Sequence, residues 1–176
     1  AMEVMDEEGR ILGPDEVGEI VLRAPSIMKE YLDDPEATAE IKKFGWLHTG
    51  DIGYRDRDGY WYITDRKRDM IVSGGFNIFP FEIESVLMAH PAVQDCAVVG
   101  VPDEKWGEAV KAVVLLTPGR EASAQELAEL CREKLGGMKT PKSIDFWEDL
   151  PRSPVGKVLK REIRKAFWEG RGRSVG

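Results

Sequence analysis

The feature that most constrains the fold of this 176-residue chain is the run from Cys96 to Val101, which contains no charged or hydrogen-bonding polar side chain. A strand with one face in water alternates apolar and polar residues, so an uninterrupted apolar run is typical of a strand buried on both faces. Such a strand needs other elements packed over it. We therefore expect a sheet in this part of the chain, with helices packed on it.

Two further strands and three helices are expected around this run. Ala109 to Leu116 and Ile144 to Trp147 read as the strands. Helix start and stop signals lie at Pro80, at the capping box of Ser123 with Glu126, and at Gly136-Gly137. A last helix is expected to begin near Val158 and to bury Leu159, Ile163 and Phe167. From Phe76 onward, the pattern predicts a small α+β domain with a sheet of about three strands.

Residues 1–64 read mainly as strands and turns. Glu19 to Arg23 is a short strand, and the acid, proline and acid at 34–36 start a small helix. Trp46 to Tyr54 and Tyr60 to Thr64 are aromatic-rich strands joined through Asp58-Gly59, a strong hairpin signal. The five charged residues at 65–69 then separate this β-rich part from the α+β part.

The charge is unevenly distributed along the chain. The net charge is −7, yet residues 1–60 hold 15 acids and 7 bases, whereas residues 136–176 hold 5 acids and 10 bases. A basic segment attracts either nucleic acid or a phosphate-rich small molecule. The basic segment has no clustered aromatic residues for base stacking, which favours a nucleotide ligand over nucleic acid.

Nothing in the composition points to a secreted, membrane-spanning or metal-binding protein. The two cysteines, Cys96 and Cys131, lie in apolar segments and read as buried thiols in a reducing compartment. No apolar run approaches the roughly 20 residues that span a bilayer. Residues 1–10 are acidic and therefore unlike a signal peptide. We expect a cytoplasmic protein with no metal site.

Thr49-Gly50-Asp51 is the first of three places where polar residues interrupt the packing pattern. A carboxylate in this strand could accept two hydrogen bonds from a cis-diol, such as the 2′,3′ pair of a ribose, and the glycine would let the sugar approach closely. The alternative is an aspartate that only satisfies a turn. These three residues alone leave both interpretations open.

The other two places are the charged run 65–69 with Ser73-Gly74-Gly75, and the stretch LPRSPVGK at 150–157. The first reads either as a solvated turn and a hairpin, or as a pivot between two lobes and a loop that passes close to a ligand. In the second, Lys157 precedes a helix, where an ammonium can meet a phosphate or carboxylate. The alternative for Lys157 is an ordinary surface lysine.

Taken together, five ordered motifs resemble the adenylate-forming superfamily, which holds acyl-CoA synthetases, peptide-synthetase adenylation domains and beetle luciferases. They are GWLHTGD (45–51), TDRKRDMI (64–71), GGFNIFPFEIE (74–84), VGVPDEKWGE (99–108) and LPRSPVGK (150–157). The resemblance covers essentially the whole chain. Residues 65–71 and the ending KREIR (160–164) look most like fatty-acyl-CoA synthetases and related AMP-dependent acid–CoA ligases.

This resemblance implies two half-reactions and a division into domains. ATP and a carboxylic acid first give an acyl-adenylate and pyrophosphate, and a thiol then displaces AMP. A large N-terminal domain binds ATP and the acid, and a small C-terminal domain rotates between the steps. By resemblance, residues 1–64 are the β-rich end of the N-terminal domain, residues 65–69 are the hinge, and residues 70–176 are the mobile C-terminal domain.

The resemblance also implies roles for single residues. Asp51 holds the ribose hydroxyls, and Arg66 helps to hold the same nucleotide. Arg68 stands at the hinge position, where the family usually has Asp or Lys. Lys157 bridges the acid and the phosphate during adenylation, where a preorganised cation stabilises the developing negative charge. Lys157 also lies in a pattern that resembles sites where bacterial acyl-CoA synthetases are silenced by lysine acylation.

For the thiol step, the loop of Gly74 and Gly75 resembles the wall of a pantetheine tunnel. Trp106, Lys139 and Lys142 fall where some relatives contact the CoA nucleotide, and an aromatic ring with two ammoniums would suit adenine and phosphates. The alternative for Trp106 is a place in the core.

The resemblance implies ATP, a fatty or aromatic carboxylic acid and CoA as substrates, with no tightly bound cofactor and no nucleic acid. Magnesium would accompany the ATP and be held mainly by a part that this chain lacks. The chain contains no Ser/Thr/Gly-rich phosphate loop ending in Pro-Lys, so we expect a fragment that performs no adenylation alone. Its severed surface is expected to expose apolar residues and to favour self-association as a homo-oligomer or by strand exchange.

Three alternatives to a CoA ligase follow from the same residues. The nearest is an adenylation domain that loads a carrier-protein pantetheine, which ranks second because no carrier domain follows Gly176. A luciferase-like monooxygenase shares these motifs. A non-catalytic module that binds through its glycine-rich hairpin and basic tail is the alternative of another class, and it predicts that Asp51 and Lys157 are dispensable.

Overall fold

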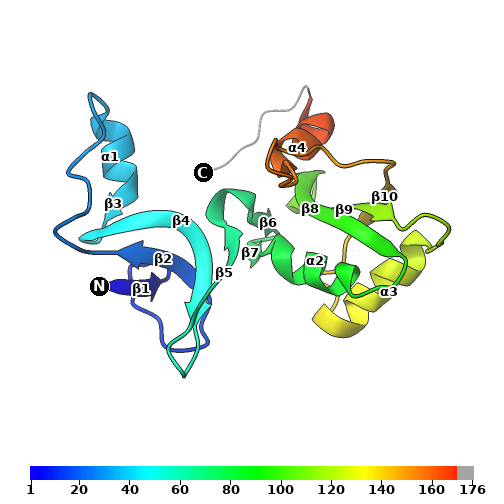
Figure 1. Cartoon of the computed structure of the whole chain (residues 1–176), viewed down its shortest axis with the longest axis horizontal. Coiled ribbons are helices and arrows are strands. Elements are labelled where there is room, and N and C mark those ends of the chain that lie inside the picture. The colour runs from blue at the N-terminus through cyan, green and yellow to red at the C-terminus, as the bar shows by residue number, and fades with distance from the viewer. Residues whose placement is uncertain (170–176) are drawn as a thin grey trace. The chain divides into compact units, whose positions relative to one another are not determined.

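The computed structural model describes residues 1–169, and its residues 1–68 form one compact unit (Figure 1). This unit is an antiparallel five-stranded sheet with one short helix. The elements are β1 (Met2–Met5), β2 (Gly18–Leu22), α1 (Pro35–Ile41), β3 (Lys42–Lys43), β4 (Trp46–Arg55) and β5 (Trp61–Arg66). The strand order is β1-β2-β4-β3, and β5 also pairs with β4.

The helix cap and the hairpin predicted from the sequence are both present in this unit. The Asp34 carboxylate accepts a hydrogen bond from the N–H of Ala37 and caps α1, and Pro35 is its first residue. β4 and β5 are antiparallel neighbours joined by a turn in which the Asp56 N–H donates to the Tyr60 carbonyl. The predicted hairpin through Asp58-Gly59 is confirmed.

The second compact unit starts at Asp69, directly after Arg68. Its elements are β6 (Ile71–Ser73), β7 (Phe76–Ile78), α2 (Pro80–Met88), β8 (Val93–Asp103), β9 (Gly107–Leu116), α3 (Ala124–Leu135), β10 (Ser143–Phe146) and α4 (Lys160–Trp168). The 3₁₀ turn η1 (Lys67–Asp69) contains the point where the two units meet along the chain.

The sheet of this second unit has five strands, in the order β10-β9-β6-β7 with β8 also paired to β9. The predicted α+β class is confirmed. The three strands expected from the sequence are β8, β9 and β10. The hairpin β6–β7 adds two more, because Ser73 pairs with Gly107, the first residue of β9. A single pair made by a three-residue strand leaves no periodic signal in the sequence.

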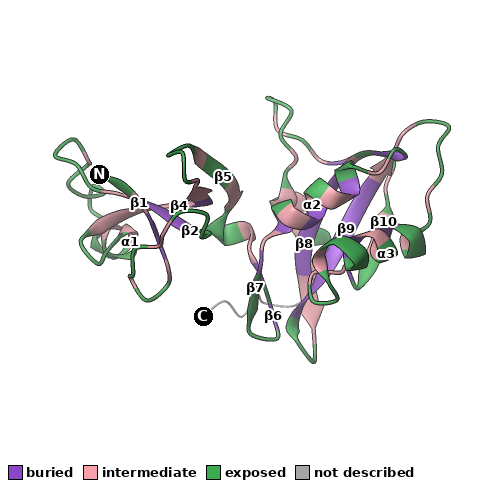
Figure 2. Cartoon of the chain, turned by 90° about the horizontal axis from the view of Figure 1, so that it is seen from below, coloured by how far each residue is buried: buried purple, intermediate pink, exposed green. Residues whose placement is uncertain are grey.

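The run from Cys96 to Val101 lies in β8, and the strand is buried on both faces, as predicted. Cys96 and Val98 belong to a core with α2 and α3, whereas Ala97 and Val99 belong to a second core with α4. Figure 2 shows that much of the buried part of this second unit lies on β8 and β9. This is the arrangement that an apolar strand without alternation requires.

The helices around this sheet follow their predicted signals with one correction. Ser123 and Glu126 form the reciprocal capping box of α3, and Gly136 ends this helix. In α4, Ile163 is fully buried and Phe167 packs against the same core, as predicted. Leu159, however, is 37% exposed. The reason is that α4 begins at Lys160 and not near Val158, and the Leu159 N–H donates to the Pro151 carbonyl in the preceding loop.

Both cysteines are buried free thiols, as predicted. Burial raises the pKa of Cys131 to about 11, and burial together with the nearby carboxylate of Glu84 raises the pKa of Cys96 above its usual range. Neither thiol is therefore ionised near neutral pH. Within residues 1–169, every helix is too short or too polar to cross a bilayer.

Candidate active-site residues

Asp51 and Arg66 lie opposite each other on two neighbouring strands of the first unit. They are direct partners in the β4–β5 ladder, and Asp51 Oδ1 lies 2.8 Å from Arg66 Nε. This is an ion-pair distance, but the pair lacks the alignment of a hydrogen bond, and Asp51 Oδ1 is buried without such a bond among the described residues. The carboxylate oxygen therefore keeps the capacity to accept a hydroxyl donor.

The backbone just before Asp51 is irregular, and polar contacts hold it. Gly50 adopts a positive φ of 74°, a conformation that costs glycine little. The Thr49 hydroxyl donates to the Ile20 carbonyl at 2.7 Å and accepts the Asp51 N–H at 3.1 Å. The Asp51 backbone is thus tied to the neighbouring strand β2.

Glu19 on β2 is a functional candidate that the sequence reasoning missed. Its carboxylate is 7% exposed and accepts hydrogen bonds from the His48 ring, the Gly50 N–H and the Lys67 ammonium, all within 3.0 Å. Burial alone would raise the pKa of Glu19, but these donors and the positive charge of Lys67 together hold its pKa below the ordinary value. The available signal was a carboxylate in the apolar strand Gly18–Leu22.

Arg68 occupies the middle of the 3₁₀ turn η1, and its side chain is exposed. Its neighbours are each paired within their own unit. Lys67 Nζ lies 2.9 Å from Glu19 Oε2 in the first unit, and Asp69 lies 3.7 Å from Arg164 of α4 in the second. The boundary between the compact units falls between Arg68 and Asp69.

Gly74, Gly75 and Trp106 come together at the tip of the β6–β7 hairpin. The Gly74 N–H donates to the Trp106 carbonyl at 2.9 Å. A Cβ on Gly74 would lie 2.5 Å from Trp106 Cε3, so the indole ring packs directly on the glycine. Trp106 is 39% exposed and belongs to neither core, so the interpretation as a core residue is wrong. Lys105 Nζ lies 4.7 Å from the indole centroid.

Lys139 and Lys142 lie beyond α3, and among the described residues neither forms a hydrogen bond or ion pair with the hairpin tip. Lys139 Nζ forms an ion pair with Glu82 Oε2 of α2 at 2.7 Å. Lys142 is exposed and lies just before β10, and its backbone N–H donates to the carbonyl of Val110 in β9. Lys139 would have to exchange its partner Glu82 to bind a phosphate.

Lys157 lies at the end of a tight turn before α4. The Gly156 N–H donates to the Ser153 carbonyl at 2.8 Å, and the Lys157 N–H donates to Ser153 Oγ at 3.1 Å. The side chain of Lys157 is exposed, and within residues 1–169 its ammonium forms no hydrogen bond or ion pair. A hydrogen-bonded turn therefore presents an exposed cation to which an anionic ligand can bind.

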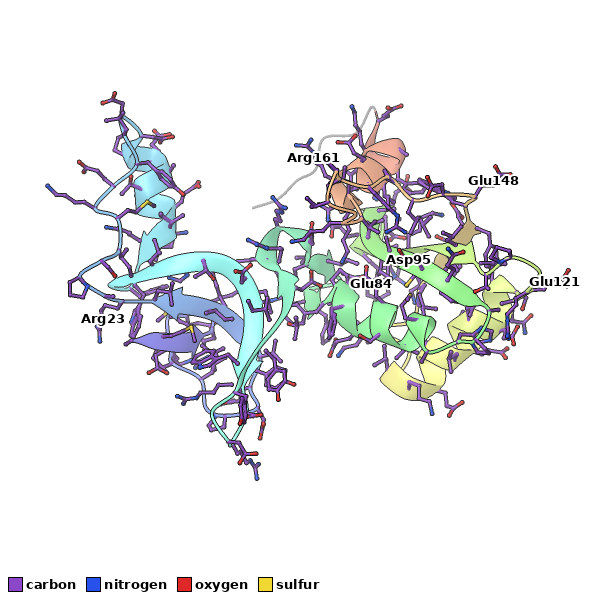
Figure 3. All side chains as sticks on the ribbon, viewed as in Figure 1. Arg23, Glu84, Asp95, Glu121, Glu148 and Arg161 are labelled. Atoms are coloured by element: carbon purple, nitrogen blue, oxygen red, sulfur yellow. The ribbon has the colours of Figure 1, made fainter. Side chains whose placement is uncertain are left out.

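Two ion pairs hold the ends of this turn on the second unit, and both use carboxylates labelled in Figure 3. Arg152 pairs with Asp95 of β8 and also donates to the Gly156 carbonyl at 3.2 Å. Lys160 pairs with Glu84 of α2, which in turn accepts the Val98 N–H. Arg152 is a second residue that the sequence reasoning missed, because its partner is 57 positions away.

The described residues 1–169 contain no cluster of three or more His, Cys, Asp or Glu side chains that could hold a metal ion. Sites in this part of the chain are therefore built from ammonium, guanidinium, carboxylate and backbone groups. These groups suit binding of hydroxyls, phosphates and carboxylates.

Comparison with curated proteins gives a consistent set of relatives. The fatty acid–[acyl-carrier-protein] ligase ScoC of Streptomyces coeruleorubidus is 46% identical over 98% of this chain and 33% of its own length. The feruloyl-CoA synthase of an Amycolatopsis species is 48% identical over 90% of this chain and 32% of its own length. The chain thus spans about a third of the length of the relatives it matches.

Solved structures with the same fold include enzymes of the same kind. ATP-bound MatB from Rhodopseudomonas palustris matches with a TM-score of 0.87 and 35% identity, over 97% of this chain and 34% of that one. The amide bond synthetase McbA from Marinactinospora thermotolerans matches with a TM-score of 0.84 and 40% identity, over 95% and 34%. Residues 82–157 match the family described as AMP-binding enzyme C-terminal domain. Residues 82–157 therefore belong to the AMP-binding enzyme C-terminal domain family, and over most of its length the chain is similar to the C-terminal third of such ligases and synthetases.

Proposed function

We propose that this chain is the C-terminal portion of an acid–thiol ligase that activates a carboxylic acid with ATP and transfers the acyl group to CoA. In the first step a carboxylate oxygen attacks the α-phosphorus of ATP, and pyrophosphate leaves. In the second step the thiol sulfur attacks the acyl carbon, the thiol proton is released, and AMP leaves. The observation that carries the proposal is the hydrogen-bonded turn before α4, which presents the exposed ammonium of Lys157.

Each site residue receives a role in these steps. Asp51 accepts the ribose hydroxyls, and the guanidinium of Arg66, 2.8 Å from it, supports the same nucleotide. Lys157 bridges the carboxylate and the α-phosphate, where negative charge builds up in the transition state. The tip of the hairpin at Gly74 and Gly75 lines the path of the pantetheine thiol.

Both steps need different groups beside the same nucleotide, which supports a rotation between them. Lys157 has to leave before the thiol can enter. A hinge at Arg68, within residues 65–69, would let residues 70–176 present Lys157 in one step and Gly74-Gly75 in the other. Residues 1–64 would then stay with the ATP- and acid-binding domain. Trp106, Lys139 and Lys142 would meet the CoA nucleotide, with Lys139 releasing Glu82.

The substrates follow from the relatives and from this chemistry. Mg-ATP and CoA serve as substrates, with the metal held mainly outside this chain, and we propose a fatty or aromatic acid as the acyl donor. Relatives are named as fatty acid, feruloyl and 2-succinylbenzoate ligases. Because the acid pocket lies in the part that this chain lacks, the chain alone would not form an adenylate. The buried free thiols favour the cytoplasm as the compartment.

A carrier-protein pantetheine is the second candidate acceptor. It is favoured by the 46% identity to ScoC, which is named as a fatty acid–[acyl-carrier-protein] ligase. The two acceptors share the pantetheine arm and differ in the group behind it, a nucleotide in CoA and a protein in the carrier.

The test is pyrophosphate exchange and acceptor-dependent AMP release by the full-length protein that carries this chain, against a panel of acids. CoA and a pantetheinylated carrier are supplied in parallel, and Lys157→Ala is measured beside the wild type. We expect exchange with at least one acid, loss of exchange in the variant, and thioester formation from a supplied acyl-adenylate in both. If no acid supports exchange in the wild type, the ligase assignment fails and the binding-module alternative gains support.

A further inference from the structure

Glu19 is a buried carboxylate that holds two segments of the first unit. Oε1 accepts the Gly50 N–H at 3.0 Å, and Oε2 accepts the Lys67 ammonium at 2.9 Å and lies 2.9 Å from Nδ1 of His48. Gly50 immediately precedes Asp51, and Lys67 immediately follows Arg66. Asp51 and Arg66 are the two residues proposed to bind the nucleotide, and the Glu19 carboxylate therefore binds a chain neighbour of each of them.

The strand pairing around this carboxylate is irregular on both sides of β4. The β2–β4 register shifts between Glu19 and Val21, and the β4–β5 register shifts between Ile52 and Gly53. Gly50 itself has a positive φ. A regular ladder would fix the strand through its backbone bonds, but here a side chain accepts the Gly50 N–H in place of a strand carbonyl.

We propose that Glu19 is a positioning residue of the nucleotide site, which holds Asp51 and Arg66 face to face by fixing Gly50 and Lys67. The inference rests on the proposed function. The three donors to Glu19 keep its carboxylate charged against the effect of burial, and together with its low exposure they hold it in one orientation. The side chain of Lys67, by contrast, is 44% exposed. Glu19 touches neither reacting group and acts through the two segments that it joins.

The test is Glu19→Gln in the full-length ligase that carries this chain. The amide keeps the shape of Glu19 and its oxygen can still accept the Gly50 N–H, but it loses the charge that attracts Lys67. Because a displacement of about 1 Å at a binding group can cost up to about a hundredfold, we expect the KM for ATP in pyrophosphate exchange to rise by about tenfold or more. The kcat at saturating ATP should stay within about twofold.

A merely structural role predicts a different result, namely a lower kcat with an unchanged KM for ATP; a lower thermal midpoint is expected in either case, because the charge of Glu19 also contributes to stability. Asp145→Asn is the matched control, since Asp145 forms a 2.8 Å ion pair with Lys111, a lysine that is buried in the second unit. We expect this control to lower the thermal midpoint and to leave the KM for ATP unchanged. Lys67→Met should raise that KM, and Lys67→Arg, which keeps the charge, should restore it.

A double-variant comparison tests the route of the effect. If Glu19 acts through Asp51, then Glu19→Gln adds little to the KM for ATP when Asp51→Asn is already present. Fully additive effects, or a wild-type KM in Glu19→Gln, would overturn the positioning role while leaving the ligase assignment intact. Absence of pyrophosphate exchange in the wild type, or a wild-type KM in Asp51→Asn, would instead refute the proposed function and this inference with it.

Discussion

The contact between Gly74 and Trp106 allows a prediction whose size follows from the geometry. In Gly74→Ala, the new Cβ would lie 2.5 Å from Trp106 Cε3, whereas ordinary contacts begin near 3.4 Å. The indole ring or the hairpin therefore has to shift by about 1 Å, and such overpacking costs about 1–3 kcal/mol. The positive φ of Gly74, 58°, adds about 1–2 kcal/mol for any residue with a Cβ.

Gly75→Ala is the matched control for this prediction. Gly75 also has a positive φ, 82°, but a Cβ there would meet no atom within 4 Å. We expect Gly75→Ala to lower the free energy of unfolding by the conformational cost alone, about 1–2 kcal/mol, and Gly74→Ala to lower it by about 2–5 kcal/mol. Denaturant unfolding of the chain measures both values.

The effects of substitutions at Gly74 and Trp106 on the free energy of unfolding should depend on each other. Trp106→Ala removes the ring, so the cost of Gly74→Ala in that background should fall to the cost of Gly75→Ala. Equal destabilisation by the two single alanine variants, or an unchanged cost of Gly74→Ala without the ring, would refute the reasoning. In the full-length protein, Gly74→Ala should slow the thioester step more than pyrophosphate exchange, because the hairpin is assigned to the thiol.

Three further predictions concern other parts of the chain. Lys157→Ala should reduce pyrophosphate exchange by about a hundredfold or more and should largely keep thioester formation from a supplied adenylate. Equal losses in both reactions would contradict a role of Lys157 in the first step. Ser123→Ala removes the cap of α3 and should lower the free energy of unfolding by about 1 kcal/mol in denaturant titrations. Ser85→Ala, at a mid-helix serine of α2, is the comparison, and an equal effect of the two variants would contradict the capping role. The folded-state pKa of Glu19 lies below its ordinary value of 4.5, so its contribution to stability is present above pH 4.5 and is lost as the pH falls through the folded-state pKa. Glu19→Gln should therefore flatten this part of the stability–pH curve. A curve identical to that of the wild type would show that Glu19 does not contribute.

Much of the second unit could be predicted because its signals are local. The Cys96–Val101 run lacks alternation, and β8 is accordingly buried on both faces. The Ser123–Glu126 box spans three positions and caps α3 as expected. Such patterns depend on helix and strand periodicity and on nearby hydrogen bonds, which the sequence carries directly.

The joining of the β6–β7 hairpin to the sheet could not be read in the same way. Ser73 pairs with Gly107 across 34 positions, and a single pair made by the three-residue strand β6 has no periodic signature. The position of Trp106 was open for the same reason. Its ring covers Gly74 and stays partly exposed, and nothing local to Trp106 distinguishes this from burial in the core.

The sequence by itself determined the α+β class, the caps, the order of the five motifs and hence the resemblance to adenylate-forming enzymes, because these depend on residue types at fixed short spacings. Only the tertiary structure showed that Glu19 joins Gly50 to Lys67, and that Arg152 holds the Lys157 turn against Asp95. These partners lie 31, 48 and 57 positions apart. Which distant side chains meet is decided by strand register and packing, and a buried charge reveals its role only when its partners are in place.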